Sequence, residues 1–197
     1  SGVTTFMIGR LAVGFGGERY ALVLACLASM FAPIFLAFFG LFTMNAFDLA
    51  LWASAFLLAQ KIAQSHRSRD WYWLGVIIGL GALNKISMLW LGAGLFVGIL
   101  GTSHRTTLRS TAPWLAGGLA AVLFLPFVLW NMTHDFAHLE FIRNATSEKY
   151  ASQNPMTFFS DVVLLMNPLA VPLWLAGLVF LVVRTEHRMI GFAVLAV

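Results

Sequence analysis

Residues 79–90 read GLGALNKISMLW, so that an amide and an ammonium, Asn84 and Lys85, stand side by side between two apolar stretches. Several Lys and Arg residues flank the wider segment 71–101 on both sides. Because Lys and Arg mark the cytoplasmic ends of membrane-spanning helices, an even number of crossings must separate the two flanks. The segment therefore predicts a helical hairpin that turns at Asn84 and Lys85.

The two arms of this hairpin, 71–84 and 87–101, are short for membrane spans. About 15 residues at 1.5 Å per residue reach roughly 22 Å, against a hydrocarbon core of about 30 Å. The polar turn is therefore expected to lie slightly sunk in the outer leaflet. Each arm also carries two small residues at four-residue spacing, which predicts close packing of one arm against the other. These residues are Gly75, Gly79, Gly94 and Gly98.

The composition places the whole chain in a membrane. Hydrophobic residues make up 60% of the 197 residues and charged residues only 10%, and the mean hydropathy of +0.85 lies outside the range of soluble domains. The fold class expected is an all-α polytopic helical membrane protein, a single transmembrane domain over residues 1–197. It would have about six full spans and two truncated ones, as a fragment of a larger module. Beyond the two arms, the full spans are expected near 20–40, 46–63, 112–130 and 168–183.

The basic residues predict the orientation. Nine of the twelve Lys and Arg residues fall on one side of the expected spans, which the positive-inside rule makes cytoplasmic. Lys85, Arg143 and Lys149 fall on the other, outer side. The basic residues do not cluster on one soluble face, which argues against a nucleic-acid partner. The nine are Arg10, Arg19, Lys61, Arg67, Arg69, Arg105, Arg109, Arg184 and Arg188.

Two interpretations of Lys85 are open. The lysine could reach the interface from a helix C-terminus, where the helix dipole favours a cation. It could instead belong to an anion site, because the next helix begins near Ser87 and directs its free N–H groups to the same place. Ionisable groups inside membrane segments are commonly functional.

Asp48 opens the expected 46–63 span from the outer side and has two similar interpretations. Asn45 could cap this helix while Asp48 complements the dipole of its first turn. Asp48 could also form a pair with Lys85, since the two residues are expected at similar depth on the same side of the membrane.

The longest stretch between spans, 131–167, holds the remaining candidates. His134 and His138 have i, i+4 spacing, and Glu140 follows; the three could hold a divalent metal, although zinc needs three or four ligands and a solvated amphipathic turn is the default. No metal site is assigned and no cofactor is identified. Arg143 and Lys149 supply cations that could bind phosphate or sugar, or simply contact lipid headgroups.

The end of this stretch predicts a helix that lies in the membrane interface. Its apolar residues begin after Asn154 and Pro155, and the Asn167–Pro168 pair ends it.

Several absences narrow the function. The chain has no Walker motif, no GxSxG, no HExxH and no dinucleotide fingerprint. It also has no charged residue in the middle of a span, where ion-coupled transporters usually carry one. Polar residues gathered at one interface favour an enzyme that acts on a lipid headgroup. A transporter or flippase for a lipid-linked substrate, or a non-catalytic membrane subunit, remain the alternatives.

Four stretches taken together resemble the bacterial branch of the protein-mannosyltransferase-like GT-C glycosyltransferases, which includes the Rgt-type galacturonosyltransferases and the aminoarabinose transferases of lipid A. The likeness covers nearly the whole chain. The stretches are 11–52 (LAVGFGGERYALVLACLASMFAPIFLAFFGLFTMNAFDLALW), 79–100 (GLGALNKISMLWLGAGLFVGIL), 125–144 (LPFVLWNMTHDFAHLEFIRN) and 164–178 (LLMNPLAVPLWLAGL).

The resemblance implies an enzyme that moves a sugar from a polyprenyl-phosphate carrier to a glycan, lipid (lipid A or lipopolysaccharide) or protein acceptor on the periplasmic side. Its catalytic base is expected in a first outer loop before this segment, with Asp48 in a supporting role. The polar turn of the family's hairpin matches Asn84 and Lys85, with Lys85 expected on the carrier phosphate. The family's next outer loop matches the region that holds four further candidates for substrate binding. These are His134, Glu140, Arg143 and Lys149.

Overall fold

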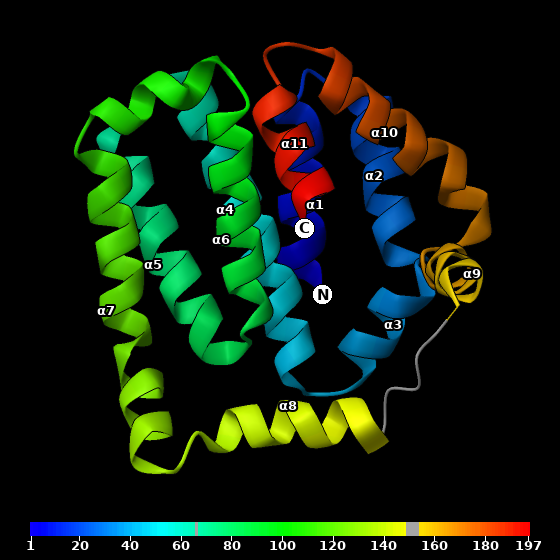
Figure 1. Ribbon diagram of the computed structural model, residues 1–197. Helices are drawn as coiled ribbons and strands as arrows, with labels where there is room; N and C mark the ends of the chain where they lie inside the picture. Colours follow the sequence, from blue (N-terminus) through cyan, green and yellow to red (C-terminus); the bar gives the residue numbers. More distant parts are fainter. Residues whose placement is uncertain (66, 149–153) are drawn as a thin grey trace.

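The protein is a bundle of helices that run up and down between two ends (Figure 1). The computed structural model describes residues 1–65, 67–148 and 154–197, which are 85% helical and contain no strand. This confirms the all-α membrane fold class. In chain order the helices are α1 (Gly2–Gly14), α2 (Arg19–Met30), α3 (Pro33–Gly40), α4 (Met44–Ser65), α5 (Ser68–Asn84), α6 (Ser87–Leu100), the 3-10 helix η1 (Ser103–Arg109), α7 (Ala112–Thr133), α8 (Ala137–Glu148), α9 (Pro155–Leu165), the 3-10 helix η2 (Pro168–Ala170), α10 (Val171–Val183) and α11 (Arg188–Ala196).

Two described helices, α4 and α7, are long and apolar enough to cross a membrane alone, and each has 22 residues. Three bent pairs pass the same test together, which gives up to five spans in the described part of the chain. One pair divides the predicted span 20–40: α2 and α3 meet at 60°. Pro33 at the start of α3 has no N–H to continue the preceding helix, so the chain bends there.

The hairpin is confirmed, because α5 ends at Asn84 and α6 begins at Ser87. The predicted packing of its glycines against each other is wrong. A Cβ atom on Gly75 would meet the backbone of Ala116 on α7, and one on Gly98 would meet the backbone of Met189 on α11. Each arm therefore uses its small face to approach a different helix, α7 for α5 and α11 for α6. Four-residue spacing identifies a close-approach face but does not say which helix approaches it.

The core lies where α4, α5, α6 and α11 meet. Ala55 and Ala59 of α4 and Leu91 of α6 are almost completely buried in it. The small side chains on α4 let these helices approach closely, so the hairpin turn is held against the first residues of α4.

A helix, α9, occupies the stretch for which an interfacial helix is predicted, and its position relative to the membrane stays a prediction. Asn154 caps it, its Oδ1 accepting a hydrogen bond from the N–H of Met156 at 3.0 Å. Asn167 then adopts a left-handed conformation (φ 72°), and the chain turns by 91° into η2 and α10. A helix at right angles to the following span has the geometry expected of an interfacial helix.

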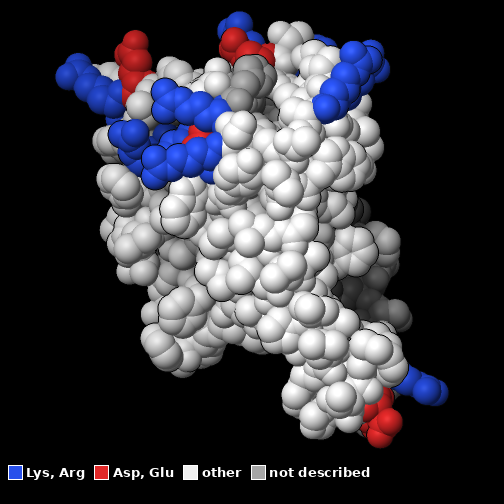
Figure 2. All heavy atoms as spheres, turned by 90° about the vertical axis from the view of Figure 1, so that its left-hand side faces the viewer, with Lys and Arg blue, Asp and Glu red and all other residues white. Residues whose placement is uncertain are grey.

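Charged side chains gather at the two ends of the molecule and leave a wide uncharged band between them (Figure 2). At one end α1, α4, α6 and α10 finish and α2, α5, α7 and α11 begin (Figure 1). The nine basic residues predicted for the cytoplasmic side all lie in these helix ends and the connections between them. The α5–α6 turn, the start of α4 and α8 lie at the opposite end (Figure 1).

We expect Gly98→Ala to destabilise the bundle by roughly 1–3 kcal/mol, because the new methyl group would force α11 away from α6. Gly92→Ala on the same helix is the matched control. Its Cβ would lie at 3.7 Å from Ile78, an ordinary contact, so its melting temperature should equal or exceed that of the wild type. Thermal unfolding of the detergent-purified protein measures both, and equal melting temperatures for the two variants would contradict the α6–α11 packing.

Candidate functional site

The α5–α6 turn places two polar side chains beside the first turn of α4. The N–H of Lys85 donates to the carbonyl of Gly81 at 2.8 Å and closes α5. Lys85 itself is extended (φ −156°), which reverses the chain so that α6 can begin two residues later. Asn84 Nδ2 donates to the carbonyl oxygen of Met44 at 2.9 Å and ties the turn to α4.

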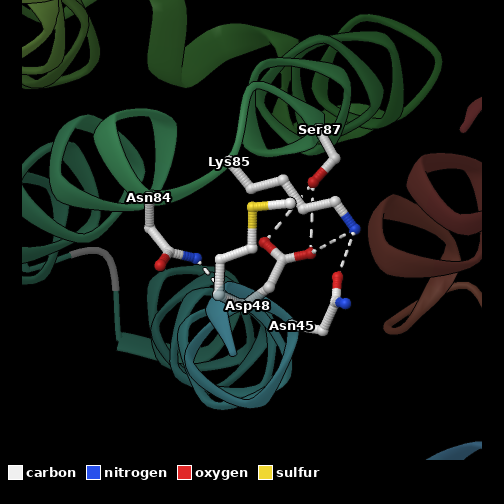
Figure 3. A network of polar contacts seen from close by, with 6 residues as sticks. Asn45, Asp48, Asn84, Lys85 and Ser87 are labelled. Carbon is white, nitrogen blue, oxygen red and sulfur yellow. Dashed lines mark hydrogen bonds and ion pairs between the residues drawn. The ribbon is translucent and has the colours of Figure 1, made fainter. Parts of the chain in front are cut away.

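Five side chains converge here on one polar cluster, which consists of Asn45, Asp48, Asn84, Lys85 and Ser87 (Figure 3). Lys85 Nζ donates to Asn45 Oδ1 at 2.9 Å and lies 3.7 Å from Asp48 Oδ2. Ser87 Oγ donates to the same carboxylate, at 3.2 Å from Oδ2 and 3.4 Å from Oδ1. The carboxylate therefore has an ammonium on one side and a hydroxyl from the start of α6 on the other.

The cluster is partly shielded from solvent. The Asp48 side chain is 13% exposed and that of Lys85 is 34% exposed. An ammonium has three N–H donors, of which one is used by Asn45 and one faces Asp48. No other acceptor for Lys85 is present in the described part of the chain, so the third donor is available to an anion.

The structure argues against the capping interpretation of the start of α4. The helix begins at Met44, so Asn45 lies within its first turn, and the Asn45 side chain accepts from Lys85. Asp48 lies beyond the first turn, where the attraction of the helix dipole for a carboxylate has largely faded. Both side chains instead face the hairpin turn, as the pairing interpretation predicted.

Sequence reasoning missed two contributions, the carbonyl group of Asn45 and the hydroxyl of Ser87. Asn45 and Asp48 are three residues apart, and Trp52 follows four residues later, a spacing that puts all three on one face of α4. That face is the signal that could have found Asn45. The buried indole N–H of Trp52 has no hydrogen-bond partner among the described residues.

The two histidines do not share a helix face, contrary to the i, i+4 spacing. Asp135 and Phe136 have positive φ angles (51° and 56°) and turn the chain sharply between α7 and α8. The His134 ring stacks on Trp130 at 4.3 Å, whereas the His138 ring packs edge-on against Phe127 at 5.2 Å. No group of three or more potential metal ligands occurs in the described part of the chain.

Two further candidates lie on α8, which crosses the end of the bundle opposite the basic end, below the hairpin turn (Figure 1). Glu140 and Arg143 are exposed on this helix, and no hydrogen bond or ion pair that the structure describes joins either to the polar cluster. The side chain of Asn131 anchors the start of α8, because its Oδ1 accepts from the N–H of His138 at 3.0 Å. Lys149 lies outside the described residues.

Comparison with known protein families identifies a match over most of the chain. The family model described as dolichyl-phosphate-mannose-protein mannosyltransferase covers residues 1–130, which is 130 of the 197 residues. The matched region contains the whole polar cluster and ends before α8. No curated protein and no solved structure matches the chain significantly.

A double-mutant cycle tests the pairing of Lys85 with Asp48. We expect Asp48→Asn to lower the melting temperature by about 2–4 °C, the equivalent of about 1 kcal/mol for a chain of this size, because it leaves a partly buried ammonium without its carboxylate. Adding Lys85→Met should restore part of that loss, since no unpaired charge then remains. Additive losses in the double variant would show that the two side chains are energetically independent.

Proposed function

Because the chain belongs to the dolichyl-phosphate-mannose-protein mannosyltransferase family, we propose that it moves a sugar from a polyprenyl-phosphate carrier to an acceptor at the periplasmic face of a bacterial inner membrane. The family is one of membrane glycosyltransferases that use a lipid-linked sugar. The observation that carries the proposal is the Lys85 ammonium, held by Asn45 and Asp48 at the end of the bundle opposite the basic end.

Lys85 has the chemistry that a phosphate leaving group needs. In the transfer, the bond between the anomeric carbon and the phosphate oxygen breaks, and the acceptor oxygen forms the new bond to that carbon. The phosphate leaves with the bonding electrons, and the acceptor's hydroxyl proton passes to a general base, for which we propose an aspartate of a first outer loop. An ammonium beside the phosphate stabilises the negative charge that develops as the bond breaks.

Asp48 acts by positioning Lys85. With Asn45 it fixes the ammonium at the turn, and the contact from Ser87 holds the carboxylate in place. This arrangement reduces the reorganisation needed when the carrier binds, because the ammonium is already oriented and partly desolvated. Asn84 contributes indirectly by tying the turn to Met44.

The acceptor is proposed to approach across α8. Glu140 and Arg143 are exposed there and offer a carboxylate and a guanidinium to the hydroxyl or phosphate groups of a glycan, a lipid such as lipid A, or a protein. His134 and Lys149 border the same region in the sequence and complete the proposed set of substrate-binding residues.

We expect Lys85→Met to reduce polyprenyl-phosphate binding and sugar transfer by roughly tenfold to a hundredfold, the range for loss of a hydrogen bond to a charged group. Lys85→Arg should be intermediate, since a planar guanidinium replaces a compact ammonium. Lys61→Met is the matched control, because Lys61 is exposed near the basic end of α4. Transfer from a panel of polyprenyl-phosphate sugars and binding of polyprenyl phosphate are measured together. Wild-type transfer and binding in Lys85→Met would show that the phosphate does not bind at Lys85.

The proposed orientation predicts which positions react with a membrane-impermeant maleimide. Cys26 is the single cysteine, so Cys26→Ser provides the background for Ser103→Cys and Thr146→Cys, both at exposed positions. In intact spheroplasts Thr146→Cys should be labelled, whereas Ser103→Cys should be labelled only after lysis. The reverse labelling pattern would show that the protein has the opposite orientation in the membrane.

A further inference from the structure

An apolar groove of about 270 Å³ lies between α5, α6 and α7, in the half of the bundle nearest the basic end. Trp71 and Leu74 of α5 form its buried floor. Phe96 of α6 and Trp114 of α7 stand at its rim and are 42% and 61% exposed. This groove lies at the opposite end from the polar cluster proposed for sugar transfer.

Two glycines keep the groove open. Gly92 and Gly117 line it from α6 and α7 and present no side chain. A Cβ atom on Gly117 would have no neighbour within 4 Å, so the space beside it is unoccupied by protein. The next residue, Gly118, is equally free of neighbours but does not line the groove. Substitutions at Gly117 and Gly118 therefore distinguish an effect of filling the groove from an effect on helix α7 itself.

A separate polar pocket of about 380 Å³ lies at η1. Trp71 lines both spaces, which makes them neighbours. The hydroxyls of Ser68, Thr107 and Ser110 line the polar pocket. An apolar groove along the helices beside a pocket lined by hydroxyl-bearing residues is suited to bind an amphipathic molecule.

The two chain segments that supply most of the lining of this polar pocket are strongly basic. The connections 64–70 and 102–111 contain four arginines and a single acidic residue, Asp70, whose carboxylate accepts a hydrogen bond from Ser65. All four arginines are exposed, and none has an ion-pair or hydrogen-bond partner among the described residues. Figure 2 shows the gathering of basic side chains at this end. The four are Arg67, Arg69, Arg105 and Arg109.

We propose that the groove and its polar pocket bind one anionic phospholipid, with an acyl chain along α5, α6 and α7 and the phosphate at η1. The apolar lining complements the chain, and the unpaired guanidinium groups complement the headgroup. A protein helix in the groove would match its apolar lining but would offer no anion to the guanidinium groups nearby. The indole N–H of Trp114 donates to the carbonyl of Leu108 at 2.8 Å, which ties α7 to η1. Tryptophan is common at the level of the lipid headgroups, where the proposed phosphate would lie.

The test is native mass spectrometry of the full-length protein, titrated with dioleoylphosphatidylglycerol and with dioleoylphosphatidylcholine. The wild type should retain one phosphatidylglycerol with about tenfold preference over phosphatidylcholine. Gly117→Leu should lower retention of phosphatidylglycerol at least tenfold, because its side chain fills the groove. Gly118→Leu carries the same change in helix propensity and should bind as the wild type does.

The headgroup contacts are tested by the double variant Arg67→Gln, Arg109→Gln. Its two substitutions are at exposed positions, so it should fold normally, retain phosphatidylcholine as the wild type does, and lose most of its preference for phosphatidylglycerol. The proposal is overturned by equal lipid retention in Gly117→Leu and Gly118→Leu, or by equal affinity of the wild type for the two lipids. It is also overturned if the wild type forms a dimer that Gly117→Leu abolishes, since a second copy would then occupy the groove.

Discussion

A cation at the membrane boundary needs polar or anionic partners, because burying it without them is costly. Lys85 finds these partners in Asn45 and Asp48, and its contacts with them join the hairpin turn to α4. The three residues come from helix segments about 40 positions apart in the chain, so their meeting fixes the hairpin turn relative to α4. Once α4 and the turn are joined, Ser87 at the start of α6 reaches the same carboxylate. The small side chains of Ala55 and Ala59 on α4 support this geometry, because they let α4 approach the hairpin closely.

The two ends of the molecule carry different chemistry. One end exposes many basic residues that have no acidic partner, which suits contact with anionic lipid headgroups. At the other end, the Lys85 ammonium is oriented by Asn45 and Asp48 and has one N–H donor that neither of them uses. Many exposed basic residues attract an anionic lipid surface, whereas one oriented ammonium such as that of Lys85 can bind a single phosphate group selectively. The band between the ends is uncharged on the face that Figure 2 shows, as a lipid environment requires.

The sequence allowed much of the fold to be predicted, because apolar length, proline and basic residues act locally. The hairpin turn and the ends of α9 followed from such signals and are confirmed. The sequence could not show which helices pack on the glycine pairs, because this depends on where distant helices lie. It could not show the separation of His134 from His138 either, because a left-handed turn between them redirects the chain. The site was predictable in part: Asp48 and Lys85 were expected on one side, but the bonds from Asn45 and Ser87 require the tertiary arrangement.

The most direct test of the central claim is a cryo-electron microscopy map of the full-length protein in nanodiscs with polyprenyl phosphate bound. We expect phosphate density within about 3 Å of Lys85 Nζ, the distance of a charge-assisted hydrogen bond, with Asp48 still in contact with the ammonium. Phosphate density at any other place, with Lys85 bonded only to Asn45 and Asp48 as it is here, would contradict the account and leave the cluster a structural tie between α4 and the hairpin.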